Sequence, residues 1–197
     1  IHKKFIKKYN VEKVKVIATS AVRSAGNKIE FLEKISEESG WIVKVISGEK
    51  EAELIFKGVL LAIKEFKNPS IILDIGGGSN ELILAHQKEM FWKESRPTGM
   101  SRVVNQFQIS DPIQPDEIKI LQNYFSKEHK SAFKKCTEIP VQTIIGCSGA
   151  FDTIADIIDK VNPGEKQRTS QEISIQQFYE IYNSLIKSTR KHRLKIK

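Results

Sequence analysis

The most informative segment of this chain is residues 71–84, Ile-Ile-Leu-Asp-Ile-Gly-Gly-Gly-Ser-Asn-Glu-Leu-Ile-Leu. An apolar run ends at the carboxylate of Asp74, three glycines follow, and a second apolar run begins after Glu81. Two short apolar runs separated by a glycine turn predict two strands of a hairpin. A Rossmann or Walker A site would need a helix after the glycines, whereas here the chain returns as a strand.

The glycine turn also suggests chemistry. Gly76, Gly77 and Gly78 let the backbone approach an anion closely, and their amide groups can form a concavity that binds phosphate. Asp74 and Glu81 bracket the turn, and carboxylate oxygens beside a phosphate are ligands that Mg²⁺ uses. The alternative is a hairpin whose acids point to water. Three glycines exceed what a tight hairpin needs, and an Asp after apolar residues is costly to bury without a partner, so we favour a functional site.

Strands and helices alternate irregularly on both sides of this hairpin. Apolar spacing and breaker residues predict further strands at 14–19, 41–46, 89–93 and 141–146, and helices at 29–39, 49–66, 98–108, 115–135, 150–160 and from 174 onward. One parallel sheet does not easily hold this order. We therefore predict two α/β lobes that meet near residues 47–70.

The net charge of +8 is concentrated at the two ends of the 197 residues. Residues 1–15 hold six lysines and one glutamate, and residues 187–197 hold six Lys or Arg and no acid. A nucleic-acid groove would spread its basic residues through the fold, whereas charged ends indicate solvated helix faces or tails. Nucleic-acid binding is therefore not expected to be the main function.

The apolar runs and cysteines favour a cytoplasmic protein without membrane partners. The longest apolar run, at 59–63, is too short to cross a bilayer, and the first residues lack the apolar stretch of a signal peptide. Cys136 and Cys147 form no metal or redox spacing, so we expect a reduced, cytoplasmic setting. Because the chain begins at Ile1 instead of Met, we expect it to be a piece of a longer protein.

Residues 47–52, Ser-Gly-Glu-Lys-Glu-Ala, begin the predicted helix at 49–66. Ser47 can cap that helix, and acids in its first turn interact well with the helix dipole. In a functional interpretation, Glu51 is a general base that orients a water molecule for attack on phosphorus. The spacing alone leaves both interpretations open.

Two further turns are weaker candidates. Arg23 follows a strand in the small-residue segment Ala18–Asn27, and its guanidinium can bind phosphate through two parallel hydrogen bonds, although a lone Arg in a loop is usually solvated. Residues 146–150, Gly-Cys-Ser-Gly-Ala, form a strand-to-helix turn whose amides suit an anion or a nucleotide. No histidine accompanies Cys147 or Ser148, so nucleophilic catalysis is not expected.

Taken in order, these segments resemble the exopolyphosphatase/guanosine pentaphosphate phosphatase family over nearly the whole chain. The matching segments are Ala18–Asn27, similar to A-T-[SA]-A-x-R-x-A-x-N; Val45–Val59, similar to I-S-G-x-E-E-A-x-L-x-x-x-G-V; Asp74–Glu81, similar to D-I-G-G-G-S-T-E; and the glycine turns Gly99–Arg102 and Gly146–Gly149. Asn80 stands where the family has Thr, and Ala150 where it usually has Thr or Ser.

The resemblance implies an actin-like, ribonuclease-H-like α/β fold of two lobes with an active site in the cleft between them. Residues 1–47 would be the C-terminal part of lobe I, and residues 48–197 most of lobe II. The family's opening D-x-G-S-N-S phosphate loop has no counterpart here. We therefore expect little or no turnover from this stretch by itself.

The same resemblance implies Mg²⁺-dependent removal of the terminal phosphate of inorganic polyphosphate by water, with guanosine pentaphosphate as the alternative substrate. The family's base falls on Glu51, and Asp74 and Glu81 would hold the metal and the attacking water. Phosphate would be cradled by Gly76, Gly77, Gly78 and Ser79, with Arg23 binding further substrate phosphates. A non-hydrolysing phosphate or nucleotide sensor, and a sugar kinase or ATPase, are rival classes. The helices near 51–66 and 174–190 suit either the core or a homodimer interface.

Overall fold

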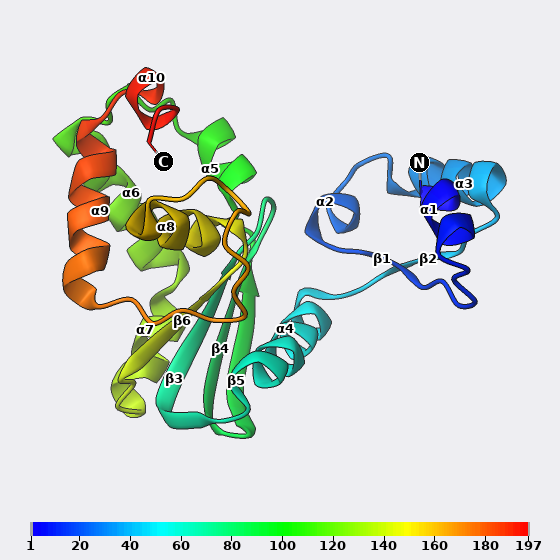
Figure 1. The fold of residues 1–197 in the computed structure, drawn as a ribbon, viewed down its shortest axis with the longest axis horizontal. Coiled ribbons are helices and arrows are strands. Elements are labelled where there is room, and N and C mark those ends of the chain that lie inside the picture. Colours follow the sequence, from blue (N-terminus) through cyan, green and yellow to red (C-terminus); the bar gives the residue numbers. More distant parts are fainter. Residues whose placement is uncertain (1, 197) are drawn as a thin grey trace. The chain divides into compact units, whose positions relative to one another are not determined.

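The computed structural model describes residues 2–196, and the chain divides into two compact units, Ile1–Ser47 and Gly48–Lys197 (Figure 1). These units have the same bounds as the two lobe parts expected above. Their assignment to lobes I and II stays a prediction.

The first unit is a small βαβ arrangement. Its elements are α1 (His2–Lys8), β1 (Val16–Ala18), α2 (Ser20–Arg23), α3 (Lys28–Ser39) and β2 (Val43–Val45). The two strands pair in parallel, with Val16 opposite Val43, so α2 and α3 form the crossover that a parallel pair requires. Helix α3 ends at Gly40, whose φ of +75° gives the left-handed cap that glycine allows.

The second unit is built around one four-stranded sheet. Its strands are β3 (Phe66–Ile75), β4 (Asn80–Gln87), β5 (Glu89–Arg96) and β6 (Thr143–Cys147), in the spatial order β5-β4-β3-β6. The first three strands form an antiparallel meander, and β6 pairs in parallel with β3. This is the ribonuclease-H-like order, so the predicted actin-like α/β class is confirmed.

The helices of the second unit are α4 (Gly48–Ile63), α5 (Met100–Gln106), α6 (Pro115–Glu128), α7 (Lys130–Glu138), α8 (Gly149–Asp159), α9 (Ile175–Lys187) and α10 (Arg190–Arg193). Figure 1 shows α4 beside the meander on one side and α6 to α9 on the other. None of the helices in residues 2–196 combines the length and the apolarity needed to cross a bilayer.

Both faces of the sheet are covered, and each carries its own apolar cluster. The cluster beneath α4 consists of Ala52, Phe56, Val59, Phe66, Ile72, Ile83 and Ala85. The cluster beneath α7 consists of Ile71, Leu82, Leu84 and Ala132. Because the face of α4 packs on the sheet, this helix belongs to the core; a homodimer stays a prediction.

Strand alternation places the acids of the central hairpin on the face that α4 covers. Side chains two residues apart on a strand share a face, so Asp74 lies on the side of Ile72 and Glu81 on the side of Ile83. The register also sets Asp74 directly opposite Glu81. The two carboxylates therefore end the apolar cluster at the glycine turn.

The predicted helix at 49–66 is too long. Helix α4 ends at Ile63, and Phe66 instead begins β3, where it is 2% exposed and stacks on Phe56 with ring centroids 5.9 Å apart. Pro69 lies within the strand, at a register shift between Phe66 and Ser70. A bulge tolerates proline because no ladder hydrogen bond is needed there.

The helix predicted at 115–135 is two helices. His129 separates α6 from α7 with φ −102° and ψ 19°, and its side chain is buried. Apolar spacing continues across this residue, so periodicity alone does not locate the break. The short helix α10 was not predicted either.

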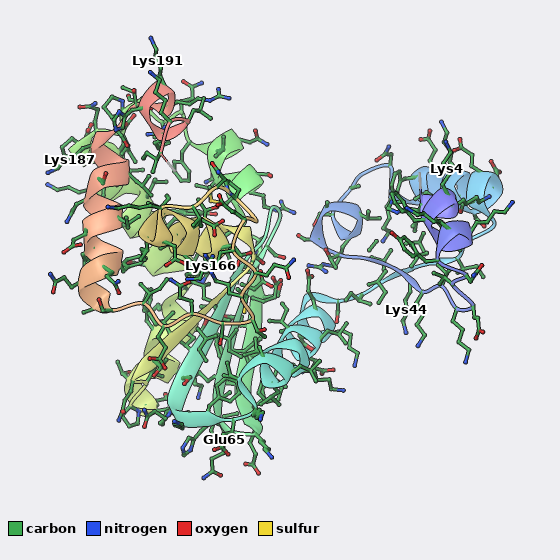
Figure 2. The ribbon with its side chains drawn as sticks, viewed as in Figure 1. Lys4, Lys44, Glu65, Lys166, Lys187 and Lys191 are labelled. Carbon is green, nitrogen blue, oxygen red and sulfur yellow. The ribbon has the colours of Figure 1, made fainter. Side chains whose placement is uncertain are left out.

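Several of the basic residues near the two ends of the chain lie on the helices α1, α9 and α10. Lys4 is an exposed residue of α1. Figure 2 shows Lys187, on α9, and Lys191, on α10, with side chains directed away from the helices that carry them. This arrangement supports the interpretation as solvated helix faces.

Candidate active site

The glycine loop at 76–79 is held from one side by the first turn of α5. The carbonyls of the three glycines accept hydrogen bonds from that turn: Gly76 from Met100 N–H at 2.9 Å, Gly77 from Ser101 N–H at 2.8 Å, and Gly78 from Arg102 Nε at 2.8 Å. A further bond, from Gly76 N–H to Ser79 O at 3.0 Å, closes the turn. Within residues 2–196, the N–H groups of Gly77 and Gly78 donate to no backbone carbonyl. The loop thus directs its carbonyls to α5 and keeps amides available for an anion.

Gly99, which precedes α5, explains how the loop and the helix come so close. A Cβ atom at this position would lie 2.5 Å from Ser79 N and 2.6 Å from the carbonyl carbon of Gly77. No real Cβ tolerates such distances from rigid backbone. Only glycine therefore fits at position 99.

Three predicted site carboxylates gather at this end of the α4 face. Glu81 is 2% exposed and accepts hydrogen bonds from the hydroxyls of Ser95, at 2.7 Å, and Ser79. Its pKa is raised, first by burial, which disfavours the charged form, and then by the negative charges of Glu51 and Asp74. Glu51, in the first turn of α4, is thus within electrostatic reach of the hairpin acids. The second unit alone assembles Glu51, Asp74 and Glu81.

Asp74 is held by the turn that precedes α8. The hydroxyl of Ser148 donates to Asp74 Oδ1, and Ser148 has a φ of +75°, a conformation that L residues adopt only at a cost. Next to it, burial raises the pKa of the Cys147 thiol to about 11, with the charge of Asp74 contributing. The thiol is therefore protonated at neutral pH, in agreement with the expectation that it is no nucleophile.

Asp74 and Glu81 lack a cationic partner among the residues that the structure describes: within residues 2–196, no Lys, Arg or His forms an ion pair with either carboxylate. In the same range, no three His, Cys, Asp or Glu side chains form a group that could hold a metal ion by themselves. Mg²⁺ is commonly held by one or two carboxylates, with water and substrate phosphate completing its shell. Asp74 and Glu81 fit that limited role.

Glu53, two residues after Glu51, is a useful contrast. Its carboxylate receives hydrogen bonds from Lys50 at 2.8 Å and Lys93 at 2.5 Å, which lower its pKa to about 2. Glu53 is therefore an ionised structural acid whose charge is compensated by Lys50 and Lys93, and the ion pair with Lys93 connects α4 to β5.

Arg23 belongs to the other unit. It ends the short helix α2, and its Nη1 donates to the carbonyl of Ile46 at 2.9 Å. That bond orients the side chain within the first unit, and its role in binding phosphate stays a prediction.

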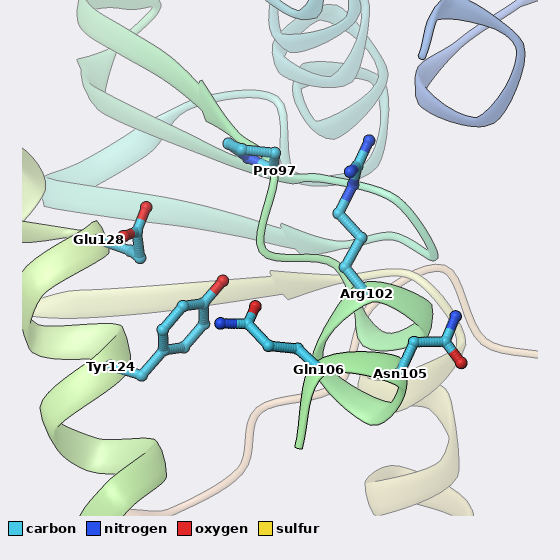
Figure 3. A pocket seen from close by; sticks show the side chains of 6 residues that line it. All are labelled: Pro97, Arg102, Asn105, Gln106, Tyr124 and Glu128. Atoms are coloured by element: carbon cyan, nitrogen blue, oxygen red, sulfur yellow. The ribbon is translucent and has the colours of Figure 1, made fainter. Parts of the chain in front are cut away.

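A pocket of about 590 Å³ opens beside the glycine loop, between α5 and α6 (Figure 3). Its lining is polar and comes from Pro97, Arg102, Asn105, Gln106, Tyr124 and Glu128. Arg102 belongs to both features, because its Nε holds Gly78 O while its side chain lines the pocket.

Sequence reasoning assigned no role to Ser95 or Arg102. The contact between Ser95 and Glu81 follows from the strand register, because β4 and β5 pair with Ser95 opposite Glu81. Arg102 depends on the packing of α5, for which the sequence carries no spacing signal.

Comparison with known proteins shows the family to which the chain belongs. The model of the Ppx/GppA phosphatase family matches residues 2–197. The chain belongs to the Ppx/GppA phosphatase family, as the ordered motifs predicted.

Individual relatives extend this result. A solved exopolyphosphatase from Cytophaga hutchinsonii is 34% identical with a TM-score of 0.92; the match covers 98% of this chain and 63% of that one. The bifunctional 3-dehydroquinate synthase/phosphatase of Fusobacterium nucleatum is 29% identical, over 88% of this chain and 28% of its own length. Exopolyphosphatase 2 of Mycobacterium tuberculosis is 26% identical, over 75% of this chain and 47% of its own. The chain thus spans less than half of these two curated relatives.

The raised pKa of Glu81 predicts that Glu81→Gln stabilises the fold at neutral pH. The pKa of Glu81 is higher in the folded than in the unfolded chain, where it is about 4.5. Its contribution to stability is fully present below the unfolded pKa and is lost as the pH rises through the folded pKa. Glutamine carries no charge to bury, so the stability advantage of the variant should grow between pH 5 and pH 8. Urea unfolding at the two pH values measures it.

Glu53→Gln is the matched control. The pKa of Glu53 is lowered, so its contribution is present above its unfolded value and lost as the pH falls. This variant should therefore lose stability at pH 8. If Glu81→Gln were also less stable than the wild type at pH 8, burial of a disfavoured charge at Glu81 would be refuted.

Proposed function

We propose that the protein containing this chain is an exopolyphosphatase, which hydrolyses the terminal phosphoanhydride bond of inorganic polyphosphate. The observation that carries the proposal is the gathering of Glu51, Asp74 and Glu81 beside a loop that keeps amides available for an anion. Membership of the Ppx/GppA phosphatase family and similarity to an exopolyphosphatase of known structure support the choice of substrate.

In the proposed reaction Glu51 accepts a proton from a water molecule as the water oxygen attacks the terminal phosphorus. The bond from that phosphorus to the bridging oxygen breaks, releasing orthophosphate and a polyphosphate shortened by one unit. The amides of Gly77 and Gly78 stabilise the terminal phosphoryl oxygens, where negative charge is spread in the transition state. Gly76 and Ser79 shape the turn, and Arg23 binds phosphates further along the chain.

Asp74 and Glu81 are the residues that would hold Mg²⁺. When bound there, the ion would neutralise charge on the phosphoryl oxygens and help place the attacking water. Ser148 and Ser95 orient the two carboxylates through hydrogen bonds to their oxygens. Burial of Glu81 among like charges favours recruitment of a cation to this position.

A phosphate-release assay on the complete protein tests the proposal. Polyphosphate, guanosine pentaphosphate and ATP are supplied separately, each with Mg²⁺ and with excess EDTA. We expect polyphosphate to release phosphate fastest, and EDTA to abolish the release. Faster release from guanosine pentaphosphate would assign the protein to the other activity of the family, and ATP consumption that requires an acceptor would indicate a kinase. No release from any substrate would contradict the enzyme.

A further inference from the structure

We propose that His129 is a positioning residue for the glycine loop, acting through a hydrogen bond to Thr98. The inference rests on the proposed function, because it assigns the loop the task of holding the reacting phosphate. His129 lies at the junction of α6 and α7, 31 residues after Thr98 and still further in sequence from the loop it would position.

The contact itself is buried and polar. His129 Nε2 and Thr98 Oγ1 are hydrogen-bonded at 3.1 Å, with the donor set by the ring tautomer. Thr98 is 1% exposed and His129 is 7% exposed. The imidazole also stacks on Phe125, with ring centroids 5.9 Å apart and planes inclined by 15°. Ring and hydroxyl are thus held in one arrangement.

Thr98 is directly coupled to the loop through the backbone. It precedes Gly99, which packs against the backbone of Gly77 and Ser79 at distances that admit no side chain. The three residues after Gly99 then donate hydrogen bonds to the carbonyls of the three loop glycines. Because the backbone at Gly99 is in close contact with the loop, a displacement of Thr98 would also displace the loop.

A second contact fastens the same helix junction to β5. Arg96 Nη2 lies 2.5 Å from Glu94 Oε1 and donates to Ser131 Oγ at 3.0 Å, at the start of α7. Ser131 in turn donates to Glu94 Oε2 at 2.5 Å. The junction is therefore a fixed support, against which the His129–Thr98 bond sets the position of the turn before α5.

The surroundings of His129 keep its ring neutral. Its pKa is lowered, first by burial and then by the cation of Arg96 on β5, while Glu94 on β5 and Glu128 on α6 oppose the shift. In the described residues its Nδ1 is buried and has no hydrogen-bond partner. Protonation would place a second N–H donor, and a charge, at that unpartnered nitrogen.

Steady-state kinetics of paired variants in the complete protein test the proposal, with polyphosphate as substrate. Thr98→Val removes the hydroxyl with little change of shape, and His129→Phe keeps the aromatic stack without the hydrogen bond. Because a small misplacement of a positioning group can cost up to about 10²-fold in rate, we expect each to lower kcat about tenfold and to change KM little. Thr98→Ser and His129→Gln, which restore a polar partner, should recover most of the rate.

Two further readouts separate positioning from simple packing. The double variant Thr98→Val with His129→Phe should be no slower than either single variant, because both remove the same bond. In the wild type, protonation of His129 should lower kcat at acid pH. This part of the pH dependence of kcat should be absent in His129→Gln. Wild-type kcat in both single variants, or rate losses that multiply in the double variant, would overturn the proposal. An inactive wild type would instead refute the proposed function.

Discussion

Replacing Glu51 by Gln is expected to lower kcat for phosphate release from polyphosphate by about 10²–10⁴-fold, the usual contribution of a general base. The glutamine keeps the size and most of the polarity of the side chain but accepts no proton from the attacking water. Substrate binding should persist, because the substitution leaves the loop amides untouched. The measurement is kcat and KM of the complete protein at saturating Mg²⁺.

Two neighbouring acids provide controls for Glu51→Gln. Glu49 lies in the same first turn of α4, where it suits the helix dipole, and Glu53 is neutralised by Lys50 and Lys93. Glu49→Gln and Glu53→Gln should each retain kcat within about threefold, since neither removes a base. A Glu51→Gln enzyme with near-normal phosphate release would refute the role of Glu51 as base, and a Glu53→Gln enzyme as slow as Glu51→Gln would show that charge on α4, not proton transfer, sets the rate.

Replacing Gly99 by Ala is expected to destabilise the second unit by about 3 kcal/mol, the upper range for overpacking, and to abolish phosphate release. The added Cβ would lie 2.5 Å from Ser79 N and 2.6 Å from Gly77 O, and backbone atoms cannot move aside as a flexible side chain can. Either α5 or the glycine loop must shift, and both positions define the phosphate site. Chemical denaturation and the phosphate assay on the complete protein measure the two effects.

Gly58→Ala is the matched control for Gly99→Ala. Gly58 is an exposed residue within α4, and a Cβ there would meet nothing within 4 Å. Alanine in a helix interior is more stable than glycine by about 0.5–1 kcal/mol, so this variant should gain stability and keep its activity. Normal stability and activity of Gly99→Ala would contradict the close packing of the loop on α5.

The central hairpin was predictable because its signals are local. Apolar runs on both sides of three glycines specify the two strands, and the register of a hairpin then sets Asp74 opposite Glu81. The end of α4 was not predictable from the sequence. Phe66 continues the helical spacing of apolar residues, but in the structure it pairs within β3 and stacks on Phe56. The break at His129 also depends on tertiary contacts, here with Thr98 and Phe125.

Some residues of the candidate site were also predictable from the sequence, and others were not. Asp74, Glu81 and the glycines stand together in sequence, and Glu51 was separated from its neighbours only by the family resemblance. Ser95, Ser148 and Arg102 act through contacts made by later elements, which no spacing within the glycine segment encodes. Their roles became visible once the strand register and the packing of α5 were known.

The proposed exopolyphosphatase would remove phosphates one at a time from the end of a polyphosphate chain. The most direct measurement is the time course of products when the complete protein acts on polyphosphate of one defined length. We expect orthophosphate to be the only small product from the first turnovers onward, while the remaining chains shorten, and Glu51→Gln to stop both. Internal cleavage into shorter polyphosphates without orthophosphate, or an unchanged chain with the wild-type protein, would contradict the proposal.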